Sequence, residues 1–267
     1  LNLKNWIQFK YRVYVCHGKP MGVNLSSRQL NQLEKALFGL RSLIFGGEFK
    51  VGQRLPEIAV SEQLGISRTP LRQAMDRLIA EGLLERISTG GCRVAVFTKE
   101  DIADAIQIRG VIEGTVARMA AERGADPALM IRAKKILAKI DHALTSNTGI
   151  DFDAYVSGNR EFHDILAHLS GSTLMIREAE RMALLPLASP SAFLSDQALI
   201  PDFQDSLRHA QRQHRTLLEA IENREGSRAE AVAREHARLA LMNFNYLTEQ
   251  RPALAKHVPG LALLTEK

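Results

Sequence analysis

The chain contains little cysteine and no long apolar run, and each shortage argues against a class of protein. Its two cysteines among 267 residues, Cys16 and Cys92, lie far apart, so we do not expect a disulfide-built secreted scaffold. We therefore expect the protein to work in a reducing cytoplasm. No stretch approaches the roughly 20 uninterrupted apolar residues that span a bilayer, so we expect no transmembrane helix and no membrane partner. The composition, with 45% hydrophobic and 24% charged residues, argues against a disordered or low-complexity chain.

The positive charge of the chain is concentrated near its beginning. The formal net charge is +5, which favours a polyanionic partner. Residues 1–100 contain 15 Lys and Arg against 8 Asp and Glu, whereas residues 101–267 contain 20 against 22. This distribution is expected if one domain binds nucleic acid and the other does not.

A helix, a tight turn and a second helix are predicted in the first part of the chain. After Ser27, apolar residues recur with a helical period, at Leu30, Leu33, Leu37, Leu40 and Ile44. A short helix over 57–64 follows, with Ile58 or Ala59, Val60 and Leu64 expected to face inward. Beyond the turn at Gly65, Ser67 is predicted to cap a third helix that ends near Glu81.

Two short strands complete this region. Residues 83–87 and 92–96 have a strand-like pattern, and the turn between them contains Gly90 and Gly91. Two helices around a glycine-containing turn, followed by a two-stranded hairpin, are the layout of a winged helix-turn-helix. We predict this domain over residues 27–97.

The start of the third predicted helix carries the residue types that bind DNA. Ser67, Arg68, Thr69 and Arg72 gather in its first turns, where free backbone N–H groups and the positive end of the helix favour phosphate. Hydroxyls bind phosphate oxygens, and arginine also reaches the guanine edge. Gly90 and Gly91 allow the wing backbone to approach DNA closely. The alternative is that Ser67 is only a helix cap and the arginines lie on a solvated face.

The rest of the chain is predicted to be helical, so the fold class is mainly α, a winged helix-turn-helix followed by an all-helical bundle over 98–250. The predicted helices are 100–123, 127–145, 151–169, about 173–185, 203–223 and 228–250. Proline and serine residues predict a long loop at 186–202. We expect residues 1–26 to form a disordered extension, with Met21 as a hypothetical start of translation, and residues 251–267 to form a C-terminal tail.

Three histidines fall on apolar helix faces. His163 lies one turn after Asn159 on the predicted helix 151–169, and His214 interrupts the apolar stripe of helix 203–223. His236 belongs to a stripe formed by Ala229, Val232, His236, Leu239, Asn243 and Tyr246. Buried polar groups need partners, and three inward histidines can satisfy one another through a metal ion. The alternative is that each is a core histidine with a backbone partner.

The first region resembles the GntR superfamily of bacterial transcription regulators. The resemblance rests on the run Gly52-Gln53-Arg54-Leu55-Pro56-Glu57, on the run from Leu64 to Met75 and on Glu81-Gly82-Leu83-Leu84. It implies a homodimer that binds a double-stranded DNA operator through Ser67, Arg68, Thr69 and Arg72, with Gly90 or Gly91 at the wing tip. Many relatives carry a basic residue where this chain has Ile58.

The helical region resembles the FCD effector domain of the FadR branch. Asn159-Arg160-Glu161-Phe162-His163, the segment from His214 to Ile221, and Arg234-Glu235-His236 match its signatures. The resemblance implies a divalent ion held by His163, His214, His236 and residue 159, and a small carboxylate effector. Asn159 replaces the usual aspartate, which removes one negative charge and lowers the expected affinity for the ion. A site of three imidazoles favours zinc or nickel.

Arg109 and Glu113 lie four residues apart on or beside the apolar stripe of helix 100–123. They form either an intrahelical ion pair or, as the resemblance implies for an arginine of this helix, part of the effector site. A guanidinium is well suited to bind a carboxylate with two hydrogen bonds.

We therefore predict a ligand-responsive DNA-binding regulator with a metal-containing pocket that binds a small carboxylate, and not an enzyme. The first alternative is a metal-free regulator of the same fold that binds an acyl thioester or a fatty acid. A metal-dependent hydrolase is a remote alternative, because the chain has no HExxH motif and the carboxylates beside His163, Glu161 and Asp164, are expected to point off its face.

Overall fold

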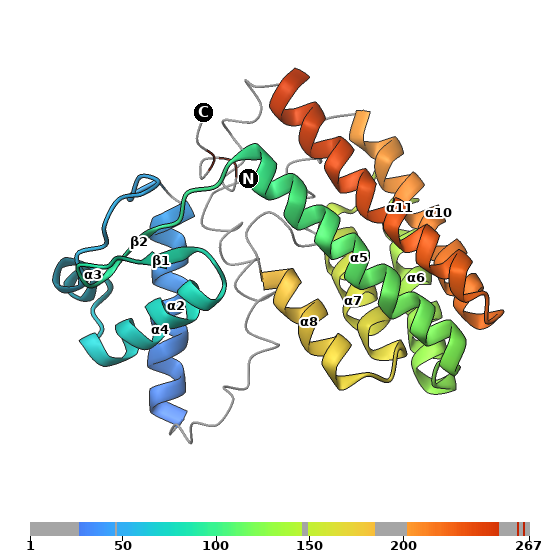
Figure 1. Ribbon diagram of the computed structural model, residues 1–267, viewed down its shortest axis with the longest axis horizontal. Coiled ribbons are helices and arrows are strands. Elements are labelled where there is room, and N and C mark those ends of the chain that lie inside the picture. Colours follow the sequence, from blue (N-terminus) through green and yellow to red (C-terminus); the bar gives the residue numbers. More distant parts are fainter. Residues whose placement is uncertain are drawn as a thin grey trace. The chain divides into compact units, whose positions relative to one another are not determined.

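The computed structural model describes most of the chain, which divides into two compact units after Lys99 (Figure 1). The described residues are 27–45, 47–145, 149–184, 202–250, 261 and 264. The predicted extension at 1–26 and all but the last residue of the predicted loop at 186–202 lie outside them. Of the predicted tail, Leu261 and Leu264 are described, and Leu264 forms a parallel bridge with Phe97 in the first unit.

The first unit contains three helices and one hairpin among its described residues. They are α2 (Ser27–Phe45), α3 (Glu57–Leu64), α4 (Arg68–Ala80), β1 (Leu84–Arg86) and β2 (Cys92–Val94). Helix α4 packs across α2, and α3 lies against α4. The strands are antiparallel, with Glu85 opposite Arg93. Leu40, Leu71 and Leu78 are almost fully buried where these elements meet.

Helix α3 differs from its predicted inward face. Val60 is its buried residue, whereas Ile58 is 61% exposed and Ala59 is exposed as well. Ile58 precedes Val60 by two residues, which is about 200° around a helix of 3.6 residues per turn, so the two side chains point in nearly opposite directions. The expectation that Ile58 or Ala59 faces inward is therefore wrong.

The second unit is helical throughout its described residues. Its elements are α5 (Lys99–Arg123), α6 (Pro127–Leu144), α7 (Phe152–Leu169), α8 (Thr173–Leu184), α10 (Asp202–Glu222), α11 (Gly226–Asn245) and the π-helical turn η1 (Tyr246–Gln250). Helix α6 packs on α7, and α10 packs on both α11 and α6. None of these helices, nor those of the first unit, is long and apolar enough to cross a membrane.

Aspartate caps fix the starts of α6 and α7. The Asp126 carboxylate accepts hydrogen bonds from the backbone N–H groups of Ala128 and Leu129, at 2.7 and 3.4 Å. The Asp151 carboxylate accepts one from Ala154 at 3.0 Å. These bonds satisfy N–H groups that have no partner within the helix.

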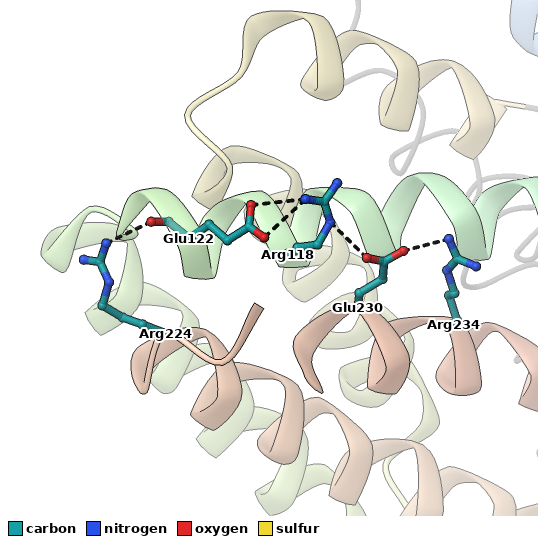
Figure 2. Close-up of polar contacts among 5 residues, drawn as sticks. All are labelled: Arg118, Glu122, Arg224, Glu230 and Arg234. Atoms are coloured by element: carbon teal, nitrogen blue, oxygen red, sulfur yellow. Dashed lines mark hydrogen bonds and ion pairs between the residues drawn. The ribbon is translucent and has the colours of Figure 1, made fainter. Parts of the chain in front are cut away.

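Helices α5 and α11 approach each other closely because α5 carries two glycines one turn apart. A Cβ atom on Gly110 would lie 2.9 Å from the Cβ atom of Ala237, and one on Gly114 would lie 3.2 Å from the carbonyl oxygen of Glu230. An ion pair also joins the two helices, between Arg118 of α5 and Glu230 of α11. Within their own helices, Arg118 pairs with Glu122 and Glu230 pairs with Arg234 (Figure 2).

This contact explains a correction to the predicted stripe of the last helix. The buried residues of α11 are Ala229, Ala233, His236, Ala237 and Phe244, whereas Val232, Leu239, Asn243 and Tyr246 of the predicted stripe are only partly buried. Ala237 faces Gly110 of α5, and small alanines make up much of the most buried face of α11, which is therefore not its most hydrophobic one. The predicted single helix also ends at Asn245 and continues as η1.

Candidate DNA-contacting surface and candidate metal centre

The N-terminus of α4 presents polar side chains to solvent. Ser67, Arg68, Thr69 and Arg72 are all exposed. Ser67 occupies the cap position, as predicted, but its side chain makes no capping hydrogen bond. Unlike α6 and α7, helix α4 therefore begins without a hydrogen bond to the side-chain oxygen of its cap residue. The hydroxyl of Ser67 and the first backbone N–H groups of α4 are thus available to an incoming phosphate.

Arg72 is held at this surface by a carboxylate. Its Nε atom lies 2.8 Å from Oε2 of Glu57, the first residue of α3, and the arginine side chain is 60% exposed. An ion pair so exposed contributes little free energy, about 0–1 kcal/mol. Arg72 can therefore exchange Glu57 for a phosphate at small cost.

The wing tip has the backbone conformation that its glycines were predicted to allow. Gly90 and Gly91 have φ angles of 93° and 84°, in the left-handed region. The Nη2 atom of Arg54 donates a hydrogen bond of 2.8 Å to the carbonyl oxygen of Gly90. The sequence reasoning did not assign Arg54 a role. The available signal was the position of Arg54 in the motif that precedes α3. The residues around Arg54 in the sequence do not indicate that its side chain reaches the wing.

The three predicted histidines come together in the second unit. His163 of α7, His214 of α10 and His236 of α11 are all buried, and one nitrogen of each lies within 4.8 Å of the other two. The Nε2 atom of His236 lies 3.1 Å from that of His214 and 3.3 Å from that of His163. We refer to these three residues as the histidine cluster.

The other nitrogen of each ring in the histidine cluster has an oxygen partner. Nδ1 of His163 lies 3.0 Å from Oε1 of Glu113, Nδ1 of His214 lies 3.1 Å from Oε1 of Gln211, and Nδ1 of His236 lies 3.1 Å from Oε1 of Gln213. Each ring can therefore donate its Nδ1 proton outward, which directs the lone pairs of all three Nε2 atoms to a common centre. Facing lone pairs repel one another unless a cation lies among them.

The spacing of the ring nitrogens suits a small metal ion. Zinc–nitrogen bonds of about 2.0–2.1 Å place neighbouring tetrahedral ligands about 3.3 Å apart. Burial and the neighbouring His163 lower the pKa of His214 well below its ordinary value, and burial with the other two histidines does the same for the pKa of His236. Neutral imidazole is the form that binds a metal. The donor set and its protonation therefore fit a divalent transition ion.

Arg109 and Glu113 are both buried on α5. The Nε atom of Arg109 lies 3.9 Å from Oε2 of Glu113, so the predicted intrahelical pair is present but long. Burial alone would raise the pKa of Glu113, but His163 and Arg109 lower it to about 2. Glu113 is therefore an ionised acceptor behind the histidine cluster.

Asn159 lies on α7 one turn before His163 and is 3% exposed. Its burial places it on the same inward face as His163, as the sequence predicts. The sequence reasoning missed Gln211 and Gln213, which hold the rings of His214 and His236. Gln211 is 3% exposed, and its Nε2 atom also donates to the carbonyl oxygen of Leu137 at 3.0 Å. Its spacing of three residues from His214 was the available signal.

Family profiles match both units. The profile of the FCD domain matches residues 104–239, and that of the bacterial regulatory proteins of the gntR family matches residues 34–94. The FCD match alone covers half of the chain.

Individual relatives agree with these profiles. The uncharacterized HTH-type transcriptional regulator YdhC of Bacillus subtilis (strain 168) is 29% identical over 133 residues, which cover 49% of this chain and 57% of that protein. The probable D-xylose utilization operon transcriptional repressor of Paenarthrobacter nicotinovorans is 26% identical over 195 residues, covering 71% and 78%. The HTH-type transcriptional repressor GlaR of Escherichia coli (strain K12) is 25% identical over 199 residues, covering 74% and 88%.

A solved structure shares the fold. McbR/YncC of E. coli superposes with a TM-score of 0.55 at 20% identity, covering 85% of this chain and 99% of that one. An identity this low supports a common architecture only.

Proposed function

This chain belongs to the GntR family of bacterial regulatory proteins and carries an FCD domain, and from that premise we propose a homodimeric regulator that senses a small carboxylate through a metal-containing pocket. Its class is that of a ligand-responsive, DNA-binding transcription regulator. Regulators of this family bind DNA operators and small effectors. We infer that this chain acts in the same way and is not an enzyme. Because its DNA target lies in the bacterial cytoplasm, we place the protein there.

The N-terminus of α4 and the wing tip support the DNA-binding role of Ser67, Arg68, Thr69, Arg72, Gly90 and Gly91. Ser67, Arg68 and Thr69 are exposed at a helix start whose cap bond is missing. Phosphate oxygens would supply the acceptors that this helix start lacks, while Arg68 has the reach to read a base edge. A homodimer would present two such surfaces to the two halves of a palindromic operator.

A single observation carries the metal proposal: the three Nε2 atoms of the histidine cluster converge while each Nδ1 atom meets a side-chain oxygen. We assign His163, His214 and His236 as ligands and Asn159 as the fourth protein donor, through its amide oxygen. The imidazoles favour zinc or nickel over a harder ion such as calcium. When bound, the ion would supply a positive centre for the carboxylate of the effector.

Arg109 is the proposed protein partner of that carboxylate, and Glu113, itself an anion, belongs to the proposed effector site as the ion-pair partner of Arg109. Arg109 is 3% exposed, and its Nε atom lies 3.9 Å from one carboxylate oxygen of Glu113, whose other oxygen lies 3.0 Å from His163. A buried guanidinium beside the histidine cluster would give an anionic effector a charge-assisted contact.

One observation favours the alternative of a metal-free regulator that binds an acyl thioester or a fatty acid. Asn159 supplies no negative charge, and an ion held by three imidazoles and an amide is less well neutralised than one held by a carboxylate. This alternative requires the histidine cluster to remain without a cation.

For the hydrolase alternative, neither carboxylate beside His163 is positioned as a general base. Glu161 pairs with Lys139 at 3.5 Å, and Asp164 lies 3.7 Å from Arg160. Both carboxylates are partly exposed and interact away from the histidine cluster, which disfavours metal-assisted hydrolysis.

Elemental analysis combined with DNA binding tests the proposal. The purified chain should contain about one zinc or nickel ion per subunit, and it should select specific fragments from a genomic library over random competitor DNA at about 0.15 M salt. A panel of small carboxylates should then change its affinity for a selected fragment. Failure to select any fragment would refute the regulator, whereas selection without any bound metal, even after reconstitution, would favour the metal-free alternative.

A further inference from the structure

The carboxylate of Glu113 is placed by the contact between two helices. Gly110 and Gly114 lie on either side of Glu113 in the sequence, and both face α11, where added Cβ atoms would meet Ala237 and the side chain of Arg234 at 2.9 and 3.0 Å. His236 is the neighbour of Ala237 on α11. The closest part of the helix contact therefore brings Glu113 next to the histidine cluster.

Charged residues hold α5 and α11 together beyond the glycines. Arg118 Nε of α5 lies 2.9 Å from Glu230 Oε2 of α11, and Arg224, in the turn just before α11, donates to the carbonyl oxygen of Glu122 of α5 at 2.9 Å (Figure 2). These contacts restrict sliding of α5 along α11. Glu113 therefore meets the ring of His163 from a fixed position.

Glu113 is not itself a ligand in this arrangement. Its Oε1 atom approaches Nδ1 of His163, the nitrogen that faces away from the common centre of the histidine cluster. The other two rings meet neutral glutamine oxygens at the same position. Glu113 is thus the anionic member among the three outward partners, at 8% exposure.

We propose that Glu113 is a positioning residue of the metal centre and that it restores, through the imidazole of His163, the negative charge that Asn159 does not supply. A carboxylate that accepts the Nδ1 proton of a ligating histidine makes the opposite nitrogen a stronger donor and fixes the orientation of the ring. This inference rests on the proposed metal-binding function and refines the predicted effector role of Glu113. The Nε atom of Arg109 lies 3.9 Å from the second oxygen of Glu113.

Three variants of the full chain test the inference. Glu113→Gln retains an oxygen acceptor for His163 but removes the charge, so zinc affinity should fall about 10–100-fold. Asp104→Asn is the matched control: it also replaces a carboxylate by an amide on the same helix, at an exposed residue outside the α5–α11 ion pairs described above, and zinc affinity should not change. The double variant Glu113→Gln/Asn159→Asp should regain most of the lost affinity, because a carboxylate returns to the centre.

Competition titration against a chromophoric chelator gives the affinities, and thermal unfolding of the metal-free proteins shows whether each variant folds. Wild-type affinity in Glu113→Gln, or no recovery in the double variant, would overturn the inference while leaving the metal site in place. Absence of zinc binding by the wild type would overturn the proposed metal function together with this refinement.

A measurement on the wild type covers the case in which Glu113→Gln does not fold. In the zinc-loaded protein with ¹⁵N-labelled histidine, the Nδ1 proton of His163 should resonate further downfield than those of His214 and His236, because its acceptor is charged. A proton on Nε2 of His163, or an Nδ1 proton no further downfield than the other two, would overturn the inference.

Discussion

At the start of α4, Ser67, Arg68 and Thr69 are exposed and the cap hydrogen bond is missing, whereas His163, His214 and His236 are buried and both nitrogens of each ring have neighbours. The N-terminus of α4 presents donors for which a bound partner would supply the hydrogen-bond acceptors. The polar groups of the histidine cluster find their partners within the helices of the second unit. Function and stability should therefore be separable at the first site and coupled at the second.

Removing the proposed metal ion should have the largest effect, because an ion bound by the three buried histidines would stabilise the folded state. An ion present at about 1,000 times its Kd stabilises the folded state by about 4 kcal/mol. Each kcal/mol shifts the unfolding midpoint of a domain of this size by about 2–4 °C, so a chelator should lower the midpoint by roughly 10 °C. Thermal unfolding followed by circular dichroism measures this. His214→Gln, which lacks one ligand, should not respond to the chelator, and an unchanged midpoint in the wild type would contradict the coupling.

Arg68→Ala should weaken DNA binding by about 1–3 kcal/mol if the guanidinium reads a base edge, because a bidentate contact is lost. Its exposure predicts an unchanged unfolding midpoint. Fluorescence anisotropy with a selected DNA fragment measures the affinity. Arg238→Ala, at an arginine of α11 whose side chain is 72% exposed, serves as the control and should bind DNA like the wild type. Equal losses of DNA affinity in both variants would show that Arg68 contributes only a non-specific electrostatic attraction to DNA.

The smallest effects are expected for substitutions of two helix-cap residues, Ser67 and Asp126. Ser67→Ala should cost only a few tenths of a kcal/mol of stability, since no cap bond is lost, whereas Asp126→Ala should cost about 1 kcal/mol. DNA affinity should change in the opposite order, falling for Ser67→Ala and staying constant for Asp126→Ala. Urea unfolding and anisotropy measure the two quantities. A stability loss for Ser67→Ala as large as that for Asp126→Ala would indicate that Ser67 is an ordinary cap.

Periodicity predicted the helices well where a continuous apolar stripe exists, as in α2, α6 and α7. It failed for the inward faces of α3 and α11. In α3, Val60 is buried as predicted, but a helix of eight residues has too little pattern to show that Ile58 and Ala59 face outward. In α11, three of the five buried residues are alanines, and one of them, Ala237, packs against Gly110 of α5. A hydrophobicity pattern cannot recognise a face selected for small size.

The histidines and Asn159 were identifiable because polar residues on apolar stripes need a reason to be buried. Gln211 was missed although its spacing of three residues from His214 was an available signal. Gln213 and Arg54 were not identified because polar residues on a helix surface or in a loop are common and carry no such signal. The partners of Gln211, Gln213 and Arg54 lie 3, 23 and 36 residues away in the chain, and for Gln213 and Arg54 only folding shows the contact.

The sequence by itself determined that this chain has a basic DNA-binding region and a helical domain with three inward histidines, because charge, period and motif are local properties of the chain. Only the tertiary structure decided which nitrogen of each ring faces the common centre, and that Glu113 stands behind His163. Those facts depend on how closely α5, α7, α10 and α11 approach, and this distance is set by packing between residues remote in sequence.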